Sequence, residues 1–371
     1  LLGLVTDDAR PTLAVWPATA AAEQAFCAAA APFFFELGDA AGSTQIRGYR
    51  VACDGGALST ALAWTFDVPG GEALAAAAVR YDGAQSTALL GRVLGDRSVR
   101  YKYINPHVGT LAAQRADGSG GVSVYLYDRV SGRLLHTAHH AAARVDAAHR
   151  FLATQTENRV IYQLWHDEVA AGSPARGYVT VVADLFESER PDERDARPDF
   201  SSLDLRLPSV VAAAFVAPEA ATALGTTRTA SHITARDVVF ALESGKLLAL
   251  PDPLLDPRRP TGAPSADEQA EGLVPYAAQL PLDPRRVLSH GHAVARVRRV
   301  VSAPTHLEST SLVAAYGLDL FFTRVSPSGT FDQLSPSFSK LNLAATTLAL
   351  AVGCLLGGPM VRRRLAARAW A

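Results

Sequence analysis

The chain has 371 residues, and its 35 Lys and Arg residues against 36 Asp and Glu residues leave a formal net charge of −1. That balance argues against a nucleic-acid-binding protein, because phosphate contacts need a clustered excess of basic residues. A hydrophobic content of 49% argues against global disorder, and three cysteines exclude a disulfide-dense miniature scaffold and a four-cysteine zinc site.

The first residues are typical of the middle of a domain. Residues 1–16 predict two strands joined by a turn, and they lack the pattern of a signal peptide. We therefore expect a truncated N-terminus, with a signal peptide and earlier domains missing. Residues 18–31 are rich in Ala and stop before Pro32, which predicts a helix. Cys27 lies in this helix, and its spacing from Cys53 is compatible both with a disulfide and with two free thiols.

Short runs rich in Val, Tyr, Trp, Thr and Leu dominate the rest of the chain up to about residue 325. Such runs, separated by turn residues, predict a mainly β fold. Residues 315–325 alternate between apolar and polar positions, which predicts one strand. This strand would lie close to the membrane, because an apolar run that could span a bilayer follows at residues 341–361. Residues 188–199 and 256–272, which are charged and contain several prolines, predict surface loops. The clearest strands are expected at residues 61–68, 122–128, 159–167 and 177–186.

Two β-hairpins share one pattern, a strand, a Ser-Gly turn and a second strand that opens with a basic residue. They cover residues 124–136 and 238–250, with Gly132 and Gly245 in the turns. Glycine suits these turns because it adopts positive φ without steric cost. The pattern recurs in β-propeller blades, so we predict a β-propeller, with an array of β-sandwiches as the alternative.

No sequence motif of catalysis is present. GxSxG, P-loop, HExxH and Rossmann glycine patterns are all missing, so we expect no catalytic, metal or cofactor-binding residues. His290 and His292 would share one face of a strand, and His306 with Glu308 repeats that spacing. These four groups could ligate zinc, and the alternative is a set of surface histidines in a β-rich domain.

Residues 341–361 form a run of 21 residues without a formal charge. As a helix the run is about 31 Å long, which matches a hydrocarbon core of about 30 Å. It predicts one transmembrane helix, and the alternative is a buried core helix. Pro359 is expected in the last turn of this helix, where it would loosen the turn.

A small residue occupies every fourth position on one face of this predicted helix. Such a face permits close approach of a second helix, and the alternative is ordinary Gly and Ala usage in an Ala-rich chain. The predicted helix-packing residues are Ala345, Ala349, Gly353 and Gly357.

Basic residues are concentrated on the C-terminal side of the apolar run. Lys340 precedes the run, and Arg362, Arg363, Arg364 and Arg368 follow it. By the positive-inside rule we expect a cytosolic C-terminus and a lumenal N-terminal region. The predicted organisation is a β-propeller region at 1–326, a membrane-approach segment at 327–340, the span at 341–361 and a short cytosolic tail at 362–371.

Several long and collinear segments together resemble one family. They include GRVLGDRSVRYKYINPH (91–107), VYLYDRVSGRLLH (124–136), VIYQLWH (160–166), FSSLDLRLP (200–208), ITARDVVFALESGKLLALPDPLLDPRRP (233–260), LVPY (273–276), LESTSLVAAYGLDLFFTRVSPSGTFDQL (307–334) and the closing RAW (368–370). The family is subunit 1 of the ER membrane protein complex, and the resemblance is to its C-terminal portion.

The resemblance implies a non-catalytic scaffold and anchoring subunit in the endoplasmic reticulum membrane. Its lumenal part would be a partial β-propeller, followed by one C-terminal span. The complex inserts tail-anchored and multipass membrane proteins, with an insertion route formed mainly by other subunits. The expected partners are the other subunits, membrane-protein clients and the lipid bilayer, with no cofactor and no nucleic acid.

The resemblance also implies an amphipathic helix that braces the spans of other subunits at the lumenal membrane surface. Residues 200–217 are the preferred candidate, because their apolar residues recur at spacings of three and four. Residues 327–340 are the alternative. Arg258 and Arg259, which lie between two prolines, could pair within the chain or with a partner subunit.

Two other classes of function are compatible with a membrane-tethered propeller. One is an enzyme of the quinoprotein type, against which the irregular spacing of Trp16, Trp64, Trp165 and Trp370 argues. The other is a lumenal receptor for peptides or glycans.

Overall fold

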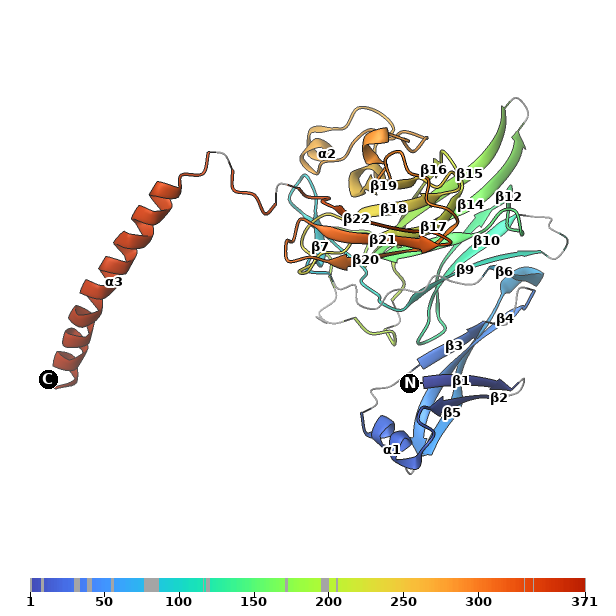
Figure 1. The fold of residues 1–371 in the computed structure, drawn as a ribbon, viewed down its shortest axis with the longest axis horizontal. Helices are drawn as coiled ribbons and strands as arrows, with labels where there is room; N and C mark the ends of the chain where they lie inside the picture. Colours follow the sequence, from blue (N-terminus) through green and yellow to red (C-terminus); the bar gives the residue numbers. More distant parts are fainter. Residues whose placement is uncertain are drawn as a thin grey trace. The chain divides into compact units, whose positions relative to one another are not determined.

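The computed structural model is mainly β, with one long C-terminal helix (Figure 1). The chain divides into two compact units, Leu1–Ser328 and Gly329–Ala371, and each is described by itself. The structure describes residues 2–7, 10–29, 34–38, 42–54, 57–76, 87–115, 117, 121–170, 173–194, 200–204, 206–329, 331–335 and 337–370.

The first unit is built from small antiparallel sheets that follow one another along the chain. We name them sheets A to G, and each strand pairs with neighbours that are close in sequence. Sheet A has β1 (Leu2–Asp7) and β2 (Arg10–Val15); sheet B has β3 (Phe34–Gly38), β4 (Gln45–Asp54) and β5 (Ala57–Asp67); sheet C has β6 (Glu72–Ala76), β9 (Val108–Arg115), β10 (Val122–Asp128) and β11 (Leu134–His140); sheet D has β7 (Gly91–Val93) and β8 (Val99–Tyr101).

The remaining three sheets follow in the second half of the unit. Sheet E is the largest and contains the two longest strands of the structure, β14 and β15. Sheet E has β12 (Ala143–Arg144), β13 (Leu152–Thr156), β14 (Arg159–Ala170), β15 (Ser173–Phe186) and β16 (Ser209–Val216); sheet F has β17 (Ala221–Thr226), β18 (Asp237–Leu242) and β19 (Leu247–Pro251); sheet G has β20 (Val297–Pro304), β21 (Ser311–Gly317) and β22 (Leu320–Val325).

Apolar side chains form a core between each pair of successive large sheets. Sheets B and C share a core that includes Phe66 and Tyr125. Sheets C and E share one around Leu126 and Leu164, sheets E and F around Phe215 and Phe240, and sheets F and G around Val239 and Val313. Every residue of the central strands β10 and β18 is buried, because both faces of these strands lie against a neighbouring sheet. This sheet-on-sheet order is that of β-propeller blades.

The two predicted hairpins are confirmed. The β10–β11 turn has Gly132 at φ 71°, and the β18–β19 turn has Gly245 at φ 82°. A methyl group at Gly132 would lie 2.5 Å from the ring of Trp64, so both backbone conformation and space require glycine there. Asp128 supports this turn, since its Oδ1 accepts hydrogen bonds from the backbone N–H of Val130 and of Ser131 at 2.8 and 2.9 Å.

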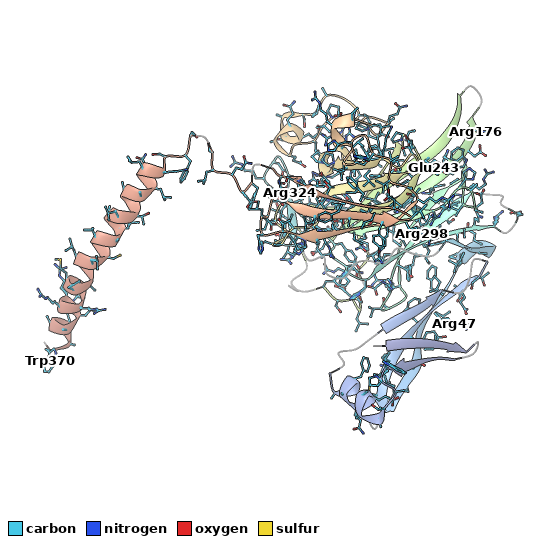
Figure 2. All side chains as sticks on the ribbon, in the orientation of Figure 1. Arg47, Arg176, Glu243, Arg298, Arg324 and Trp370 are labelled. Carbon is cyan, nitrogen blue, oxygen red and sulfur yellow. A yellow bond between two sulfur atoms is a disulfide. The ribbon has the colours of Figure 1, made fainter. Side chains whose placement is uncertain are left out.

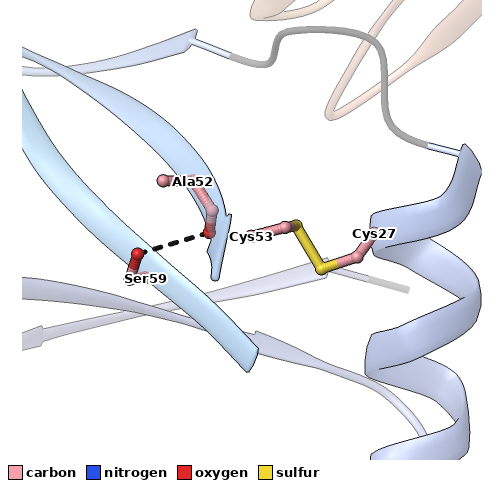
Figure 3. Close-up of a disulfide and its surroundings, with 4 residues drawn as sticks. All are labelled: Cys27, Ala52, Cys53 and Ser59. Atoms are coloured by element: carbon pink, nitrogen blue, oxygen red, sulfur yellow. Dashed lines mark hydrogen bonds between the residues drawn. A yellow bond between two sulfur atoms is a disulfide. The ribbon is translucent and has the colours of Figure 1, made fainter. Parts of the chain in front are cut away.

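The predicted N-terminal helix is confirmed as α1 (Ala20–Ala29), and it carries a disulfide (Figure 3). Cys27 of α1 is bonded to Cys53 near the end of β4, with the two Cα atoms 5.7 Å apart. The sequence spacing left this bond open, because spacing says nothing about where the helix lies relative to the hairpin. The bond links α1 to sheet B.

The prediction of a helix at residues 200–217 is wrong. The C-terminal half of this segment is β16, which pairs with β15 along its whole length, from Ser209–Phe186 to Val216–Val179. The spacing of the apolar residues favours a helix. The β-branched residues of the segment and Pro208, which cannot donate a helical hydrogen bond, disfavour one. Pairing with a long neighbouring strand decides the outcome. Leu203 and Leu207, in the preceding loop, are exposed.

Two smaller expectations also need correction. Residues 315–325 are not one strand but a tight hairpin, in which β21 and β22 are joined at Leu318 and Asp319. The backbone N–H of Gly317 donates to the carbonyl of Asp319 at 2.9 Å, which closes the turn. The loop expected at 256–272 contains a short helix, α2 (Ala266–Ala270), which Ser265 and Glu268 cap reciprocally.

Replacing both disulfide cysteines, Cys27→Ala with Cys53→Ala, should lower the free energy of unfolding of the N-terminal part of the first unit by about 3.5 kcal/mol, since the bond closes a loop of about 26 residues. Urea unfolding of the detergent-solubilised protein measures this change. Cys354→Ala is the matched control, because Cys354 is a free cysteine in the C-terminal helix. Equal stability of the double variant and the control would contradict the structural role of the bond.

Candidate functional site

The second unit contains the only helix in the described part of the chain that is long and apolar enough to cross a membrane. This helix, α3, extends from Lys340 to Ala369, so it is longer than the predicted span at both ends. At about 1.5 Å per residue, 30 residues reach about 45 Å, which covers the hydrocarbon core and the headgroup regions. The arginines expected in a separate tail therefore belong to the last turns of the same helix.

The hydroxyl groups of Thr346 and Thr347 in α3, and of Ser339 just before it, have partners in the helix itself. The Ser339 side chain caps the N-terminus by accepting a hydrogen bond from the Asn342 N–H at 3.2 Å. The Thr346 hydroxyl donates to the carbonyl of Asn342 at 2.9 Å, and the Thr347 hydroxyl donates to that of Leu343 at 2.7 Å. Each hydroxyl thus has a partner without leaving the helix, as a span requires in a medium without water.

The predicted small-residue face is present on α3. Ala345, Ala349, Gly353 and Gly357 lie on consecutive turns of one continuous helix. A methyl group added at Gly353 or at Gly357 would meet no atom within 4 Å. Pro359, which was expected in the last turn, instead lies inside the helix with ten residues of helix after it. The geometry leaves the small face open to a second helix, and its occupation stays a prediction.

In the first unit, a buried charge cluster joins sheets E and F. Arg159 of β14 and Asp184 of β15 are cross-strand partners, and they form a bidentate pair at 2.5 and 2.7 Å. The same guanidinium group contacts Asp252, in the short helical turn that follows sheet F. Although burial opposes the charge, Asp184 and Asp252 raise the pKa of Arg159, so it stays protonated. The pairing compensates the cost of burying these charges.

A second set of ion pairs holds the β7–β8 hairpin, which is sheet D, against sheets E and F. Arg92 pairs with the fully buried Asp256, and Lys102 contacts Glu157 at 2.5 Å. Glu157 also receives Arg236 at 3.1 Å. Backbone hydrogen bonds add to these contacts, since the Tyr103 N–H donates to the carbonyl of Leu185 and the Glu187 N–H donates to that of Tyr101, both at 3.0 Å.

These charges surround a cavity of about 400 Å³. Its lining includes Lys102, Glu157, Arg159 and Arg236, all of which take part in the ion pairs above. Because these groups already have partners, the cavity offers no charged group that needs a ligand. We interpret it as a gap within a structural network.

Arg258 and Arg259 also have partners within the chain. Arg258 pairs with Glu271 at 2.7 Å, and another oxygen of Glu271 accepts the Gly95 N–H at the tip of the β7–β8 hairpin at 3.1 Å. Arg259 donates to the carbonyl oxygens of Leu254, Val274 and Pro275. The structure favours pairing within the chain for both side chains, and a contact with a partner subunit stays a prediction.

The four residues considered for zinc have other surroundings. His290 and His292 lie in a turn rather than in a strand, so the shared face assumed for them is wrong. Glu308 accepts hydrogen bonds from the Thr229 hydroxyl and from the N–H groups of Ser231 and Ile233, at 2.7 to 2.8 Å. Within the described ranges, no group of three or more potential metal ligands comes together.

The Glu308 carboxylate instead connects two loops. Burial opposes its charge, but the backbone N–H groups and the Thr229 hydroxyl lower the pKa of Glu308 to about 2. This carboxylate therefore ties the loop between β17 and β18 to the loop between β20 and β21, across sheets F and G. Sequence spacing gave no signal for this role, because the two loops are far from each other in the sequence.

Taken together, the structure is a β-propeller-type array of blades followed by one helix of membrane-spanning length. A family model described as "ER membrane protein complex subunit 1, second beta-propeller" matches residues 2–328. The chain belongs to this family, which confirms the predicted resemblance and the predicted β-propeller fold with a C-terminal apolar helix.

Curated relatives named "ER membrane protein complex subunit 1" agree with the family model. Over 76% of the present chain, the sequence is 36% identical to the relative from Xenopus laevis. Over the whole of the present chain, it is 31% identical to the relative from Gallus gallus. Over 88% of the present chain, the sequence is 30% identical to the relative from Schizosaccharomyces pombe. The chain spans only 27% to 36% of the length of these relatives.

Glu308→Gln should lower the free energy of unfolding by about 2 kcal/mol at pH 7, since an amide nitrogen would face an N–H donor in place of a carboxylate oxygen. The pKa of Glu308 is about 2 in the folded chain against an ordinary 4.5, so the carboxylate stabilises the fold above pH 4.5. That contribution is lost as the pH falls toward 2. The difference between wild type and Glu308→Gln should therefore shrink below pH 4.5.

Urea unfolding at a series of pH values measures this difference. Glu189→Gln is the matched control, because Glu189 is an exposed carboxylate that forms no hydrogen bond with the described residues. A difference between wild type and Glu308→Gln that stays constant down to pH 3 would contradict the role assigned to the carboxylate.

Proposed function

We propose that this chain is a non-catalytic scaffold and anchoring subunit of the ER membrane protein complex. In this role it supports the insertion of tail-anchored and multipass membrane proteins, and its partners are the other subunits, membrane-protein clients and the lipid bilayer. The family match across residues 2–328, followed by one apolar helix that begins at Lys340, is the observation that carries the proposal.

The proposed topology places the first unit in the lumen and the C-terminus in the cytosol. The arginines at 362–364 and 368 follow the apolar part of α3, and Lys340 alone precedes it. Such an asymmetry favours a cytosolic C-terminus. The Cys27–Cys53 disulfide independently supports an oxidising compartment for the first unit.

The paired charges of the first unit suit a scaffold. Arg159, Asp184 and Asp256 are buried and bound to other parts of the chain, so they stabilise the positions of the blades and of the β7–β8 hairpin. A rigid array of blades presents fixed outer surfaces to several partners at once. No observation on the described residues favours the quinoprotein-type enzyme.

Affinity purification of the tagged full-length protein in mild detergent tests the proposal. The expected result is a stoichiometric set of membrane subunits and a cytosolic partner that co-purify with this chain. Recovery of this chain alone, folded and monodisperse, would overturn the proposal.

Replacing two residues of the small face, Gly353→Leu with Gly357→Leu, should lower recovery of the partner subunits several-fold, because leucine side chains prevent close helix approach. The matched control is Ala344→Leu with Ala351→Leu, which adds the same kind of bulk on the opposite side of α3. Quantitative mass spectrometry of the purified complex measures the effect. Equal recovery with both double variants would show that the small face is not an interface.

Reversing three charges, Arg362→Glu, Arg363→Glu and Arg364→Glu, should reduce the fraction of molecules with a cytosolic C-terminus, since the positive excess that retains this end in the cytosol is removed. A glycosylation acceptor fused to the C-terminus reports the orientation, because it is modified only in the lumen. The same substitutions to Lys keep the charge and serve as the control. An unmodified acceptor in the Glu variant would contradict the assigned role of the arginines.

A further inference from the structure

An open cavity of about 590 Å³ lies where sheets E and F meet, away from the buried charge cluster. The β14–β15 hairpin, the segment after β16 and the β18–β19 turn each contribute part of its wall. Figure 2 labels Arg176 and Glu243, which line it from two of these elements and lie near each other in the view. The lining residues that matter here are Trp165, Arg176, Tyr178, Glu219, Glu243 and Ser244.

Aromatic rings form one wall of the cavity. Trp165 and Tyr178 are cross-strand partners, and their rings meet edge to face with centroids 5.0 Å apart. The centroid of the His149 ring lies 4.6 Å from that of the Trp165 ring. The Nδ1 atom of His149 lies 2.9 Å from the Asp146 carboxylate, which holds the ring in place. The Trp165 Nε1–H is shielded from solvent and has no acceptor among the described residues. This wall is therefore preformed, and one of its donors is unused.

Two carboxylates, Glu219 and Glu243, also line the cavity. Glu219 accepts a weak hydrogen bond from the Ser244 N–H at 3.3 Å, and within the described chain neither Glu219 nor Glu243 forms an ion pair. Arg176, the one cation among the described lining residues, is already paired with Asp167 at 2.8 Å. Burial is the main cause that raises the pKa of Tyr178, and the negative charge of Glu243 raises it further. This carboxylate therefore acts on the aromatic wall.

A cation suits the ring faces and the carboxylates at once, whereas the shielded Trp165 Nε1–H adds nothing to its binding, because lysine and arginine side chains have no acceptor. A cation is attracted to the faces of Trp and Tyr rings and forms charge-assisted hydrogen bonds with carboxylates. A neutral sugar could stack on the rings and donate hydroxyl hydrogen bonds to the carboxylates, but only a cation also gains from their negative charge. We propose that this cavity binds a lysine or arginine side chain of a partner protein. The site does not depend on the scaffold assignment, because its walls belong to the first unit alone.

Calorimetric titration of the full-length protein in detergent with a tetralysine amide tests the proposal, with a tetraglutamine amide as the neutral probe. Tetralysine should bind and tetraglutamine should not, and the affinity should fall as salt is raised. Glu219→Gln with Glu243→Gln should weaken tetralysine binding roughly tenfold, the effect of losing two exposed ion pairs.

The matched control removes the same charge elsewhere. Glu189→Gln with Glu193→Gln neutralises two carboxylates in the loop that follows β15, at the other end of that strand from Tyr178. This control should change the affinity less than twofold. Equal losses in the two double variants would show general charge attraction and would overturn the proposal, as would a lack of tetralysine binding.

A third variant keeps both carboxylates and tests the cavity itself. Ser244→Lys places an amine of the same chain beside Glu219 and should abolish tetralysine binding without changing the thermal unfolding temperature. Unchanged binding in this variant would overturn the proposal. Binding of a mannose oligomer that is insensitive to salt and to Glu219→Gln with Glu243→Gln would also overturn it, in favour of a sugar site.

Discussion

The first unit depends on the fact that some of its central strands are buried on both faces. A β-sheet with one buried face can leave the other face in water, but strands such as β10 and β18 have no solvent face at all. Each such sheet is stable only between two neighbours. Successive sheets therefore pack face to face, and the four cores between sheets B, C, E, F and G follow the order of the chain.

This packing decides where charged residues can lie. Loops that cross from one sheet to the next must cover the ends of the cores, and their polar groups need partners there. Arg159, Asp256 and Glu308 supply those partners, and each joins segments that are distant in sequence. The charged residues of the cavity near Arg159 belong to this structural role, whereas Glu219 and Glu243 of the other cavity form no ion pair within the described chain.

The second unit obeys a different constraint. All apolar side chains of α3 are exposed in the isolated chain, so the helix requires a bilayer or a protein partner to remove them from water. Its Thr hydroxyls bond to its own backbone, and its arginines are concentrated near one end. These features suit a single span that anchors the blades to a membrane.

Sequence alone determined the features that depend on neighbours in the chain. The Ser-Gly hairpins with Gly132 and Gly245, the apolar run of α3 and the mainly β character all arise from local residue preferences and spacing. The family resemblance also rested on continuous segments. Such signals are readable because the interacting residues are only a few positions apart.

Tertiary structure decided what depends on distant partners. Residues 200–217 have the apolar spacing of a helix, yet hydrogen bonding to β15 makes their second half a strand. The 26-residue spacing of Cys27 and Cys53 left their bond open until α1 was placed against sheet B. Glu308 looked like a metal ligand because sequence spacing cannot show that three donors from another loop surround it. In each case the deciding contact is between segments that come together only when the tertiary structure forms.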